Sequence, residues 1–476
     1  MMKKIISISF LGVLILLTYN YLNKVFLTEH HYINTTESFK ELTKESNIDV
    51  LIFGSSRAYR TFNPFVIDYY SNTLSFNLGS DALSVPFTSL VLEQSLKYNK
   101  PKLVIFEIHA NTIKYPNTEE AKGFQLRALD FVNDLSIGKF KQTNKAYNFK
   151  EFMSVYSPLF RNHAKWYEVD FLNLSRTVEI KEHFHRGFFG TEMEISQTDK
   201  EKFKDFKSVT PKRVQKGKII KEDEIKEVER FVTIAKKNGI EVLIVSAPSL
   251  RTPFENNVFF DELSGICKLL GINYLNFNDH FSEMDLQLND FQDPGHLNIF
   301  GSSKASIYLA DFINKNYKLS DRTTEFFWKE INQDFEIFES LYIDSNDSYF
   351  LSKQKLEIKS EAIVNSIKII RNRRKHLISL YLIDFENFKS ELDKYKMGVH
   401  IFPVEKDMPL LNARSKSEGW KFELADFYLK GQSDSIYFEF NSSIRNIDRI
   451  EMFLYDESGF KGVIGNKIAV KNIVFE

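Results

Sequence analysis

The sequence has almost no cysteine: Cys267 is the only one among 476 residues. A single thiol excludes an intrachain disulfide framework and any metal site built from several cysteines. Excess charge is also absent, because 63 basic and 64 acidic side chains leave a formal net charge of −1. Such a balance gives no overall attraction for nucleic acid. Since Walker, GxGxxG and zinc-finger motifs are missing as well, we expect no cofactor, no metal and no nucleic-acid partner.

Long apolar runs are missing too, except for one at the N-terminus. Residues 5–22 carry no charge, and Lys3 and Lys4 precede them. A bilayer is crossed by about 20 apolar residues, and lysines in front favour an N-terminus that stays in the cytoplasm. No small-x-small cleavage site follows cleanly, so a retained signal anchor over residues 1–30 is favoured over a cleaved signal peptide. We therefore expect a membrane-anchored protein whose soluble body lies on the extracytoplasmic side, periplasmic or at the cell surface.

The region after the anchor alternates between strand and helix patterns. Apolar runs such as DVLIF, KLVIFEI and IEVLIVSAP are separated by helical periodicity, which predicts a parallel sheet covered on both faces. Residues 115–217 interrupt this rhythm without a strong strand and are interpreted as a mainly helical insertion. Their histidines His163, His183 and His185 are interpreted as solvated, and no acidic cluster accompanies them to hold a metal. Residues 37–317 are thus predicted to form one doubly wound α/β domain.

Beyond residue 317 the pattern changes. A helical connector is predicted over residues 318–345, followed by short strand candidates without helices between them over 346–476. Alternating segments such as SIYFEFNSS are typical of a β-sandwich. The predicted fold class is therefore an α/β domain with a doubly wound parallel sheet and a helical insertion, followed by an all-β sandwich.

Two short motifs contain residues that could do chemistry. The first, Gly54-Ser55-Ser56, directly follows the first predicted strand, and it is either an ordinary turn or a serine displayed at the carboxyl end of a sheet. A serine becomes a nucleophile only when a base takes its proton. The second motif, DPGHLNIFG, places Asp293 and His296 just before the last helix of the domain, at the same predicted sheet edge. Together the motifs predict a serine–histidine–aspartate arrangement of Ser56, His296 and Asp293.

These motifs, in this order, resemble those of the SGNH (GDSL-like) hydrolases and acyltransferases. Gly54-Ser55-Ser56 is similar to the family's G-x-S block, Asn77-Leu78-Gly79 to its second block, and Asp293-Pro294-Gly295-His296 to its last. The third block departs, because residues 107–111 read Glu-Ile-His-Ala-Asn where the family has G-x-N-D. The resemblance covers residues 45–317.

The resemblance implies a role for each matched position. Ser56 would attack an ester carbonyl, His296 would remove its proton, and Asp293 would orient the imidazole. The amides of Ser56 and Gly79 would form the oxyanion hole, with Asn111 as third donor; the departed block leaves His109, or no side chain, as the alternatives. Arg57 is either a helix cap or salt-bridge partner or a substrate-binding residue.

The domain order resembles membrane-anchored polysaccharide O-acetyltransferases of the cell envelope and the anchored D-alanyl transfer proteins. This resemblance implies an O-acyltransferase, with acetyl as the expected acyl group, that acts on an envelope or exported polysaccharide and receives its acyl group from a membrane-bound donor protein. A carbohydrate esterase of the same fold and a catalytically silent glycan- or partner-binding surface protein remain as alternatives. In the sandwich, the candidate platforms for stacking a sugar are Trp420, Tyr428, Tyr437 and Tyr455, with Trp420 as the substrate-binding candidate. The core of a sandwich needs such bulky residues, so a core role is favoured as the alternative for each of the four.

Overall fold

The chain folds, in a computed structural model, into two compact units, Met1–Trp328 and Lys329–Glu476. It is mixed α/β, with a five-stranded parallel sheet in the first unit and separate antiparallel sheets in the second. The residues that the structure describes are 2–26, 33–168, 171, 183–209, 219–255, 257–325, 328, 331–332, 335, 338–343, 348–352, 356–359, 362–372, 377–386, 395–428, 435–444, 446–455, 463–471 and 473.

Five short segments of the first unit form the parallel sheet, in the order β2-β1-β3-β6-β7. The strands are β1 (Val50–Phe53), β2 (Ser75–Asn77), β3 (Leu103–Glu107), β6 (Glu241–Ser246) and β7 (Asn273–Asn276). Every residue of β1, β2 and β3 is buried, as expected when both faces of a parallel sheet are covered. Because β2 and β3 lie on opposite sides of β1, the chain reverses its direction across the sheet there. Open α/β sheets bind ligands at the carboxyl ends of strands beside such a switch point.

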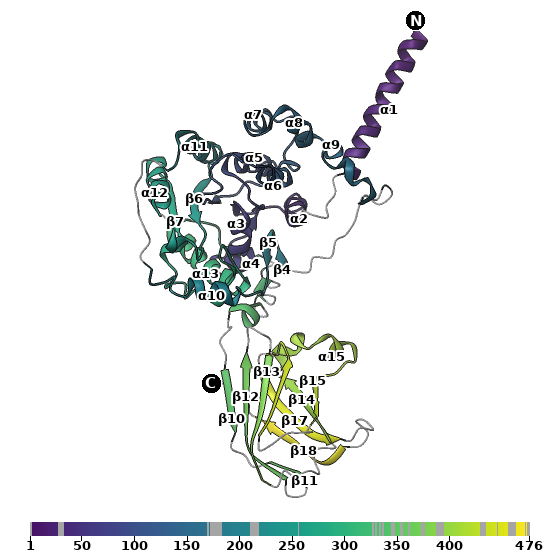
Figure 1. Ribbon diagram of the computed structural model, residues 1–476, viewed down its shortest axis with the longest axis vertical. Coiled ribbons are helices and arrows are strands. Elements are labelled where there is room, and N and C mark those ends of the chain that lie inside the picture. The colour runs from purple at the N-terminus through teal and green to yellow at the C-terminus, as the bar shows by residue number, and fades with distance from the viewer. Residues whose placement is uncertain are drawn as a thin grey trace. The chain divides into compact units, whose positions relative to one another are not determined.

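Helices cover both faces of this sheet (Figure 1). Successive strand side chains point to opposite faces, so Leu51 and Phe53 enter one core, whereas Val50 and Ile52 enter the other. The first core also takes side chains from α5 (Val85–Ser95), α11 (Glu222–Lys237) and α12 (Val258–Leu270). The second takes them from α3 (Ser56–Thr61), α4 (Pro64–Ser71) and α13 (Ile299–Asn316).

The insertion between β3 and β6 is helical but also contains a β-hairpin. Its helices are α6 (Glu119–Leu129), α7 (Ile137–Ala146), α8 (Phe149–Tyr156), α9 (Pro158–Asn162), the 3₁₀ helix η2 (His163–Glu168) and α10 (Gln197–Phe203). The hairpin pairs β4 (His183–His185) with β5 (Phe188–Gly190), which the sequence pattern does not predict. Its two turn residues, Arg186 and Gly187, have φ of 43° and 81°, as a type I′ turn requires. Strands of three residues are too short to show a period of two.

This hairpin packs against the end of β2. The amide N–H of Asn77 donates to the carbonyl of Arg186 at 2.9 Å, and the Arg186 guanidinium pairs with Asp68 at 2.7 Å. The His185 ring lies beside that of Phe65 in a tilted arrangement, with ring centroids 4.9 Å apart, and its Nε2 is buried without a hydrogen-bond partner among the described residues. Burial, with the charge of Arg186, lowers the pKa of His185 to about 3. The prediction of a solvated His185 is therefore wrong, although His163 is exposed; the side chain of His183 lies outside the described part.

Two further segments complete the first unit. Helix α1 (Met2–Phe26) contains a stretch, Lys4–Phe26, that is long and apolar enough to cross a membrane, with mean hydropathy 2.0 and none of its apolar window buried. It could serve as an anchor or a signal sequence. Helix α2 (Ile33–Leu42) follows it. At the other end, Arg322 donates to the carboxylate of Asp49 at 2.8 and 3.0 Å, which fastens the segment after α13 to the start of β1.

The second unit contains two antiparallel sheets. One has the order β10-β12-β13-β16, with β11 pairing to β12, and the other has the order β15-β14-β17-β18. A single buried cluster takes side chains from both sheets, for example Ile369 and Leu380 from one and Val399 and Leu454 from the other. The sheets therefore pack face to face. Their strands are β10 (Ser348–Ser352), β11 (Leu356–Lys359), β12 (Ala362–Asn372), β13 (Leu377–Glu386), β14 (Lys396–Pro403), β15 (Glu423–Tyr428), β16 (Ser435–Asn441), β17 (Ile447–Tyr455) and β18 (Val463–Lys471).

Candidate active site

The serine motif lies where β1 passes directly into α3. Gly54 joins the two elements with φ of 149°, and Ser55 is the N-cap of α3, because its Oγ accepts a hydrogen bond from the amide of Arg57 at 3.2 Å. Ser56 is therefore the first helical residue, where the backbone N–H has no partner within the helix. An unused N–H next to a serine hydroxyl is a suitable donor for an oxyanion.

Ser56, His296 and Asp293 form a continuous hydrogen-bonded chain. Ser56 Oγ lies 2.8 Å from His296 Nε2, and His296 Nδ1 lies 2.9 and 3.1 Å from the two carboxylate oxygens of Asp293. When Asp293 is ionised, Nδ1–H donates to it, which leaves Nε2 to accept the proton of the Ser56 hydroxyl. The structure thus brings together the three residues named from the sequence, although 240 positions separate Ser56 from His296.

A small hairpin holds the histidine and the aspartate. Strands β8 (Phe291–Asp293) and β9 (His296–Leu297) pair so that Asp293 lies opposite His296, and the amide of Gly295 donates to Asp293 Oδ1 at 2.7 Å. Burial alone would raise the pKa of Asp293, but the hydrogen bonds from His296 and Gly295 hold that pKa below its ordinary value. The carboxylate is therefore ionised at neutral pH and can orient the imidazole.

Glu107, at the end of β3, holds the turn Gly54-Ser55-Ser56 in place through hydrogen bonds to Ser55. Its Oε2 accepts hydrogen bonds from the amide and the hydroxyl of Ser55 at 3.1 and 2.8 Å. The Glu107 side chain approaches so closely that a Cβ on Gly54 would lie 2.7 Å from Glu107 Cβ and 2.9 Å from its Oε2, which explains a glycine at that position. Sequence reasoning did not identify Glu107 as a site residue; the available signal was an acid at the end of an otherwise apolar buried strand.

Glu107 also holds His109, so a second histidine–carboxylate pair lies next to the serine motif. His109 Nδ1 lies 3.1 Å from Glu107 Oε1. Burial alone would raise the pKa of Glu107, but His109, Arg57 and the amide of Ser55 hold that pKa below its ordinary value. Burial lowers the pKa of His109, and Arg57 lowers it further against the pull of Glu107. A neutral His109 therefore donates Nδ1–H to an ionised Glu107.

Three oxyanion donors are predicted, the Ser56 amide, the Gly79 amide and Asn111. In the structure the amide of Gly79 is already used in a hydrogen bond within the protein. This amide donates to Asn77 Oδ1 at 2.9 Å, and Gly79 is absent from the cavity lining. The reason is that the Asn77 side chain turns inward, where its Nδ2 also donates to the carbonyls of Ala58 and Phe62 at 3.0 and 2.8 Å. Asn111 is exposed and does line the cavity. The remaining candidate donors are thus the Ser56 amide and the Asn111 side chain.

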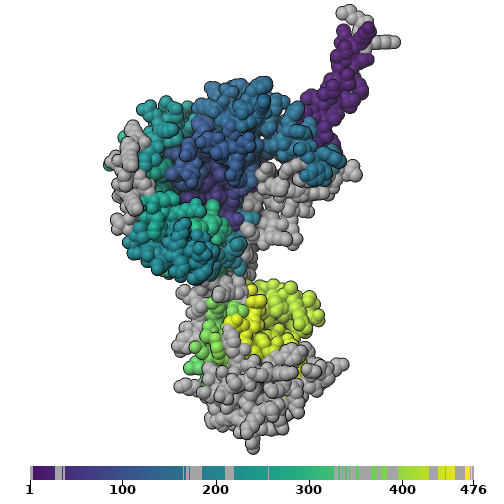
Figure 2. All heavy atoms as spheres, in the orientation of Figure 1, coloured from purple at the N-terminus to yellow at the C-terminus, as the bar shows by residue number. Residues whose placement is uncertain are grey.

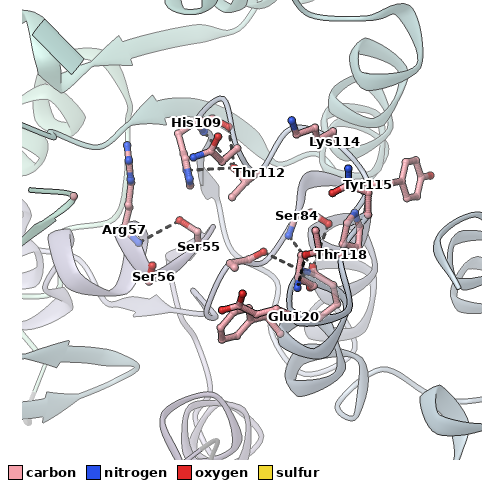
Figure 3. Close-up of a pocket in the computed structure, with 18 of the residues that line it drawn as sticks. Ser55, Ser56, Arg57, Ser84, His109, Thr112, Lys114, Tyr115, Thr118 and Glu120 are labelled. Carbon is pink, nitrogen blue, oxygen red and sulfur yellow. Dashed lines mark hydrogen bonds between the residues drawn. The ribbon is translucent and has the colours of Figure 1, made fainter. Parts of the chain in front are cut away.

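A cavity of about 370 Å³ opens over the serine (Figure 3). One wall carries Ser56, Asp293 and His296. The opposite wall comes from α6 and the segment that leads into it from β3, including Lys114, Tyr115, Thr118, Glu120 and Phe124. Insertion residues thus form much of the binding surface. The sequence gives no motif for that wall.

Arg57 and Arg251 place positive charge at this cavity. The Arg57 side chain has no hydrogen bond or ion pair closer than 4.0 Å within the described part of the chain; only its backbone N–H is used, on Ser55. Burial lowers the pKa of Arg57, and the charges of Glu107 and Glu255 oppose that effect. No acidic side chain of the described residues therefore forms a salt bridge with Arg57, and the Arg57 guanidinium is available to a ligand in the cavity.

Trp420 belongs to the second unit, whereas the residues that form this cavity belong to the first. Its ring stacks on Phe422 at 5.4 Å and lies under the guanidinium of Arg414, and it is only partly exposed. Tyr455 is buried and donates its hydroxyl to Asp426 at 2.8 Å, which confirms the core interpretation for that residue. The side chains of Tyr428 and Tyr437 lie outside the described residues.

Comparison with known proteins identifies no relative, so the functional argument rests on the geometry of the site. No protein-family model matches the chain, and no curated protein matches it.

Proposed function

We propose that this protein is a serine-dependent O-acyltransferase that acts on an envelope or exported polysaccharide through an acyl-serine intermediate. The observation that carries the proposal is the Ser56–His296–Asp293 chain at the carboxyl end of β1, open to a cavity. A separation of 2.8 Å between the hydroxyl and the imidazole is within the range for general-base activation. It supports an enzyme over a catalytically silent surface protein.

In the proposed reaction His296 Nε2 takes the hydroxyl proton while Ser56 Oγ forms a bond to the acyl carbonyl carbon. The carbonyl oxygen becomes an oxyanion, held by the Ser56 amide and the Asn111 side chain; one such donor contributes roughly 3 kcal/mol in the transition state. His296 then protonates the leaving group as the carbon–oxygen bond breaks. In the second half, His296 removes the proton of an acceptor hydroxyl, whose oxygen attacks the acyl carbon. His296 then returns this proton to Ser56 Oγ as the bond between Oγ and the acyl carbon breaks, which frees Ser56.

Transfer is preferred over hydrolysis on the basis of the resemblance and the domain order. We place the chain in the SGNH-like hydrolases and acyltransferases, with its catalytic body on the extracytoplasmic side, a membrane-bound protein as acyl donor, and the sandwich, through Trp420, as a glycan-binding unit. An esterase of the same fold would use the same Ser56, with water as the acceptor. Arg57, beside the nucleophile, would contact the substrate.

Trapping the intermediate tests the proposal. The full chain in detergent micelles, mixed with p-nitrophenyl acetate and quenched in acid, should carry an acetyl group on the peptide that contains Ser56. Oligosaccharides that accept the acyl group should shorten the lifetime of this species, whereas a lifetime set by water alone would identify an esterase. An acetyl group on other residues only, or none at all, would contradict both enzyme assignments.

Removing the negative charge of Glu107 should lower the activity of Ser56 indirectly, because Glu107 contacts the neighbouring Ser55 and not Ser56 itself. Glu107→Gln keeps the shape but weakens the acceptor of the Ser55 amide and hydroxyl, and hydrogen bonds to a charged group contribute about 1.5–3 kcal/mol. We expect kcat/KM for the nitrophenyl ester to fall about tenfold or more. Glu119→Gln is the matched control, because Glu119 is exposed at the start of α6 and neither lines the cavity nor contacts Ser55. Equal activities for the two variants would contradict the supporting role of Glu107.

A further inference from the structure

Exposed apolar side chains gather in one part of the insertion. Within the described residues of the first unit beyond α1, five large exposed hydrophobic residues are scattered elsewhere: Tyr98, Met193, Ile219, Phe254 and Leu269. The short segment 135–171 alone contributes nine: Leu135, Ile137, Phe140, Phe149, Met153, Phe160, Trp166, Tyr167 and Phe171. We call these nine residues the apolar face. Soluble proteins rarely expose so concentrated an apolar patch without a partner for it.

Helical spacing puts these residues on outward sides of adjacent elements. Phe149 and Met153 are four residues apart in α8, and Ile137 and Phe140 are three apart in α7, so each pair shares one side of its helix. The rings of Phe140 and Phe152 lie 5.8 Å apart, which joins α7 to α8. Helix α8 packs on α9, and η2 follows α9 directly. Seven of the nine residues of the apolar face therefore lie in this group of helices, whereas Leu135 precedes α7 and Phe171 follows η2.

The same helices are fastened to the last turns of α1. Asn23 Oδ1 accepts hydrogen bonds from Ser157 Oγ at 2.7 Å and from the amide of Leu159 at 3.1 Å. Asn162 Nδ2 donates to the carbonyl of Phe26 at 2.8 Å. Figure 1 shows α9, α8 and α7 leading away in turn from the base of α1, and Figure 2 shows this blue segment as the surface next to the purple helix.

We propose that the apolar face binds the lipid bilayer that α1 enters, at the boundary between headgroups and acyl chains. If α1 spans the membrane, its final turns mark the surface of the bilayer, and the hydrogen bonds from α9 hold the apolar face at that level. Trp166 and Tyr167 are of the two aromatic types that concentrate at membrane interfaces. Short amphipathic helices bind in this plane by inserting their apolar side. The proposal does not depend on the proposed enzymatic activity.

A fluorescent probe on the apolar face can distinguish two kinds of membrane attachment. If α1 alone attaches the protein, the probe stays in water; if the apolar face also binds, the probe contacts the acyl chains. Phe149 on α8 and Leu269 on α12 are matched positions, because each is a large apolar residue that is 89% exposed. Cysteine at either position can be labelled with bimane. The native Cys267 is buried, and burial raises its thiol pKa to about 12, so it reacts poorly. The unsubstituted chain provides the labelling blank.

The test uses the full chain in phosphatidylcholine vesicles with and without bromine on the acyl chains. Bimane at Phe149→Cys should lose emission in the brominated vesicles, as expected for a side chain at the acyl boundary, whereas bimane at Leu269→Cys should keep its emission. Met153→Cys provides a second probe on the same side of α8. Emission unchanged at both α8 positions would overturn the proposal, as would equal quenching at Leu269→Cys, which would indicate contact without a preferred face.

Discussion

Ser56→Ala should lower kcat/KM for p-nitrophenyl acetate by about 10⁴-fold or more, the size of loss seen when a serine nucleophile is removed from a hydrogen-bonded triad. The reason is that His296 Nε2, 2.8 Å from Ser56 Oγ, would then have no hydroxyl to deprotonate. His296→Ala should cost a similar factor, because Ser56 without a base is a weak nucleophile. The double variant should be little worse than either single variant, since residues that act as one unit do not contribute additively.

Initial rates of nitrophenol release from the full chain in micelles would measure these effects. Ser84→Ala is the matched control: Ser84 lines the same cavity, but its hydroxyl donates to Gln125 at 3.1 Å. We expect this variant to keep most of its activity. If Ser56→Ala and Ser84→Ala turn over the ester equally, then Gly54-Ser55-Ser56 is a turn and the silent binding protein becomes the better assignment.

The sheet of the first unit could be predicted because its strands are buried on both faces. Runs such as Val50–Phe53 and Leu103–Glu107 are nearly all apolar, and helical periodicity separates them, so their parallel pairing follows from pattern alone. The triad was accessible by the same reasoning. Ser56 follows a strand, and His296 precedes a helix, and in a parallel sheet both positions fall at the carboxyl edge.

The supporting residues could not be predicted, because they depend on which strands are neighbours. Glu107 reaches Ser55 only because β3 lies directly beside β1, with Phe53 paired to Phe106. Pattern recognition assigned Gly79 to the oxyanion hole by its position in a motif. In the structure the Asn77 side chain takes that amide, a contact that depends on its rotamer and not on sequence spacing.

The hairpin of the insertion shows the same limit at smaller scale. Three-residue strands offer no periodicity, and its turn, Arg186-Gly187, lacks the Asn-Gly or Asp-Gly signal typical of type I′ turns. The hairpin nevertheless packs tightly against the end of β2, so a substitution that displaces the hairpin should also affect the nearby candidate active site. Asn77 is the link, because its backbone contacts the hairpin and its side chain holds the amide of Gly79 and the end of α3.

Gly187→Ala should therefore be among the most destabilising single substitutions in the first unit. Gly187 has φ of 81°, and a Cβ there would lie 1.8 Å from the carbonyl oxygen of Asn77, which is backbone and cannot rotate away. A left-handed conformation costs a non-glycine residue about 1 kcal/mol or more, and the forced backbone shift adds roughly 1–3 kcal/mol. We expect the free energy of unfolding to fall by about 3 kcal/mol in total.

Gly239→Ala separates these two contributions. Gly239 has a similar φ of 70°, but nothing lies within 4 Å of a Cβ placed there, so only the conformational cost applies. In urea unfolding of the full chain in micelles, followed by circular dichroism, the first-unit transition of Gly187→Ala should shift to clearly lower urea than that of Gly239→Ala. Ester turnover should fall with Gly187→Ala alone, because displacing Asn77 also releases the C-terminal end of α3, the helix that begins at Ser56. Equal shifts for the two variants would mean that the hairpin moves away from β2 without cost, and that its contact with Asn77 does not hold the site.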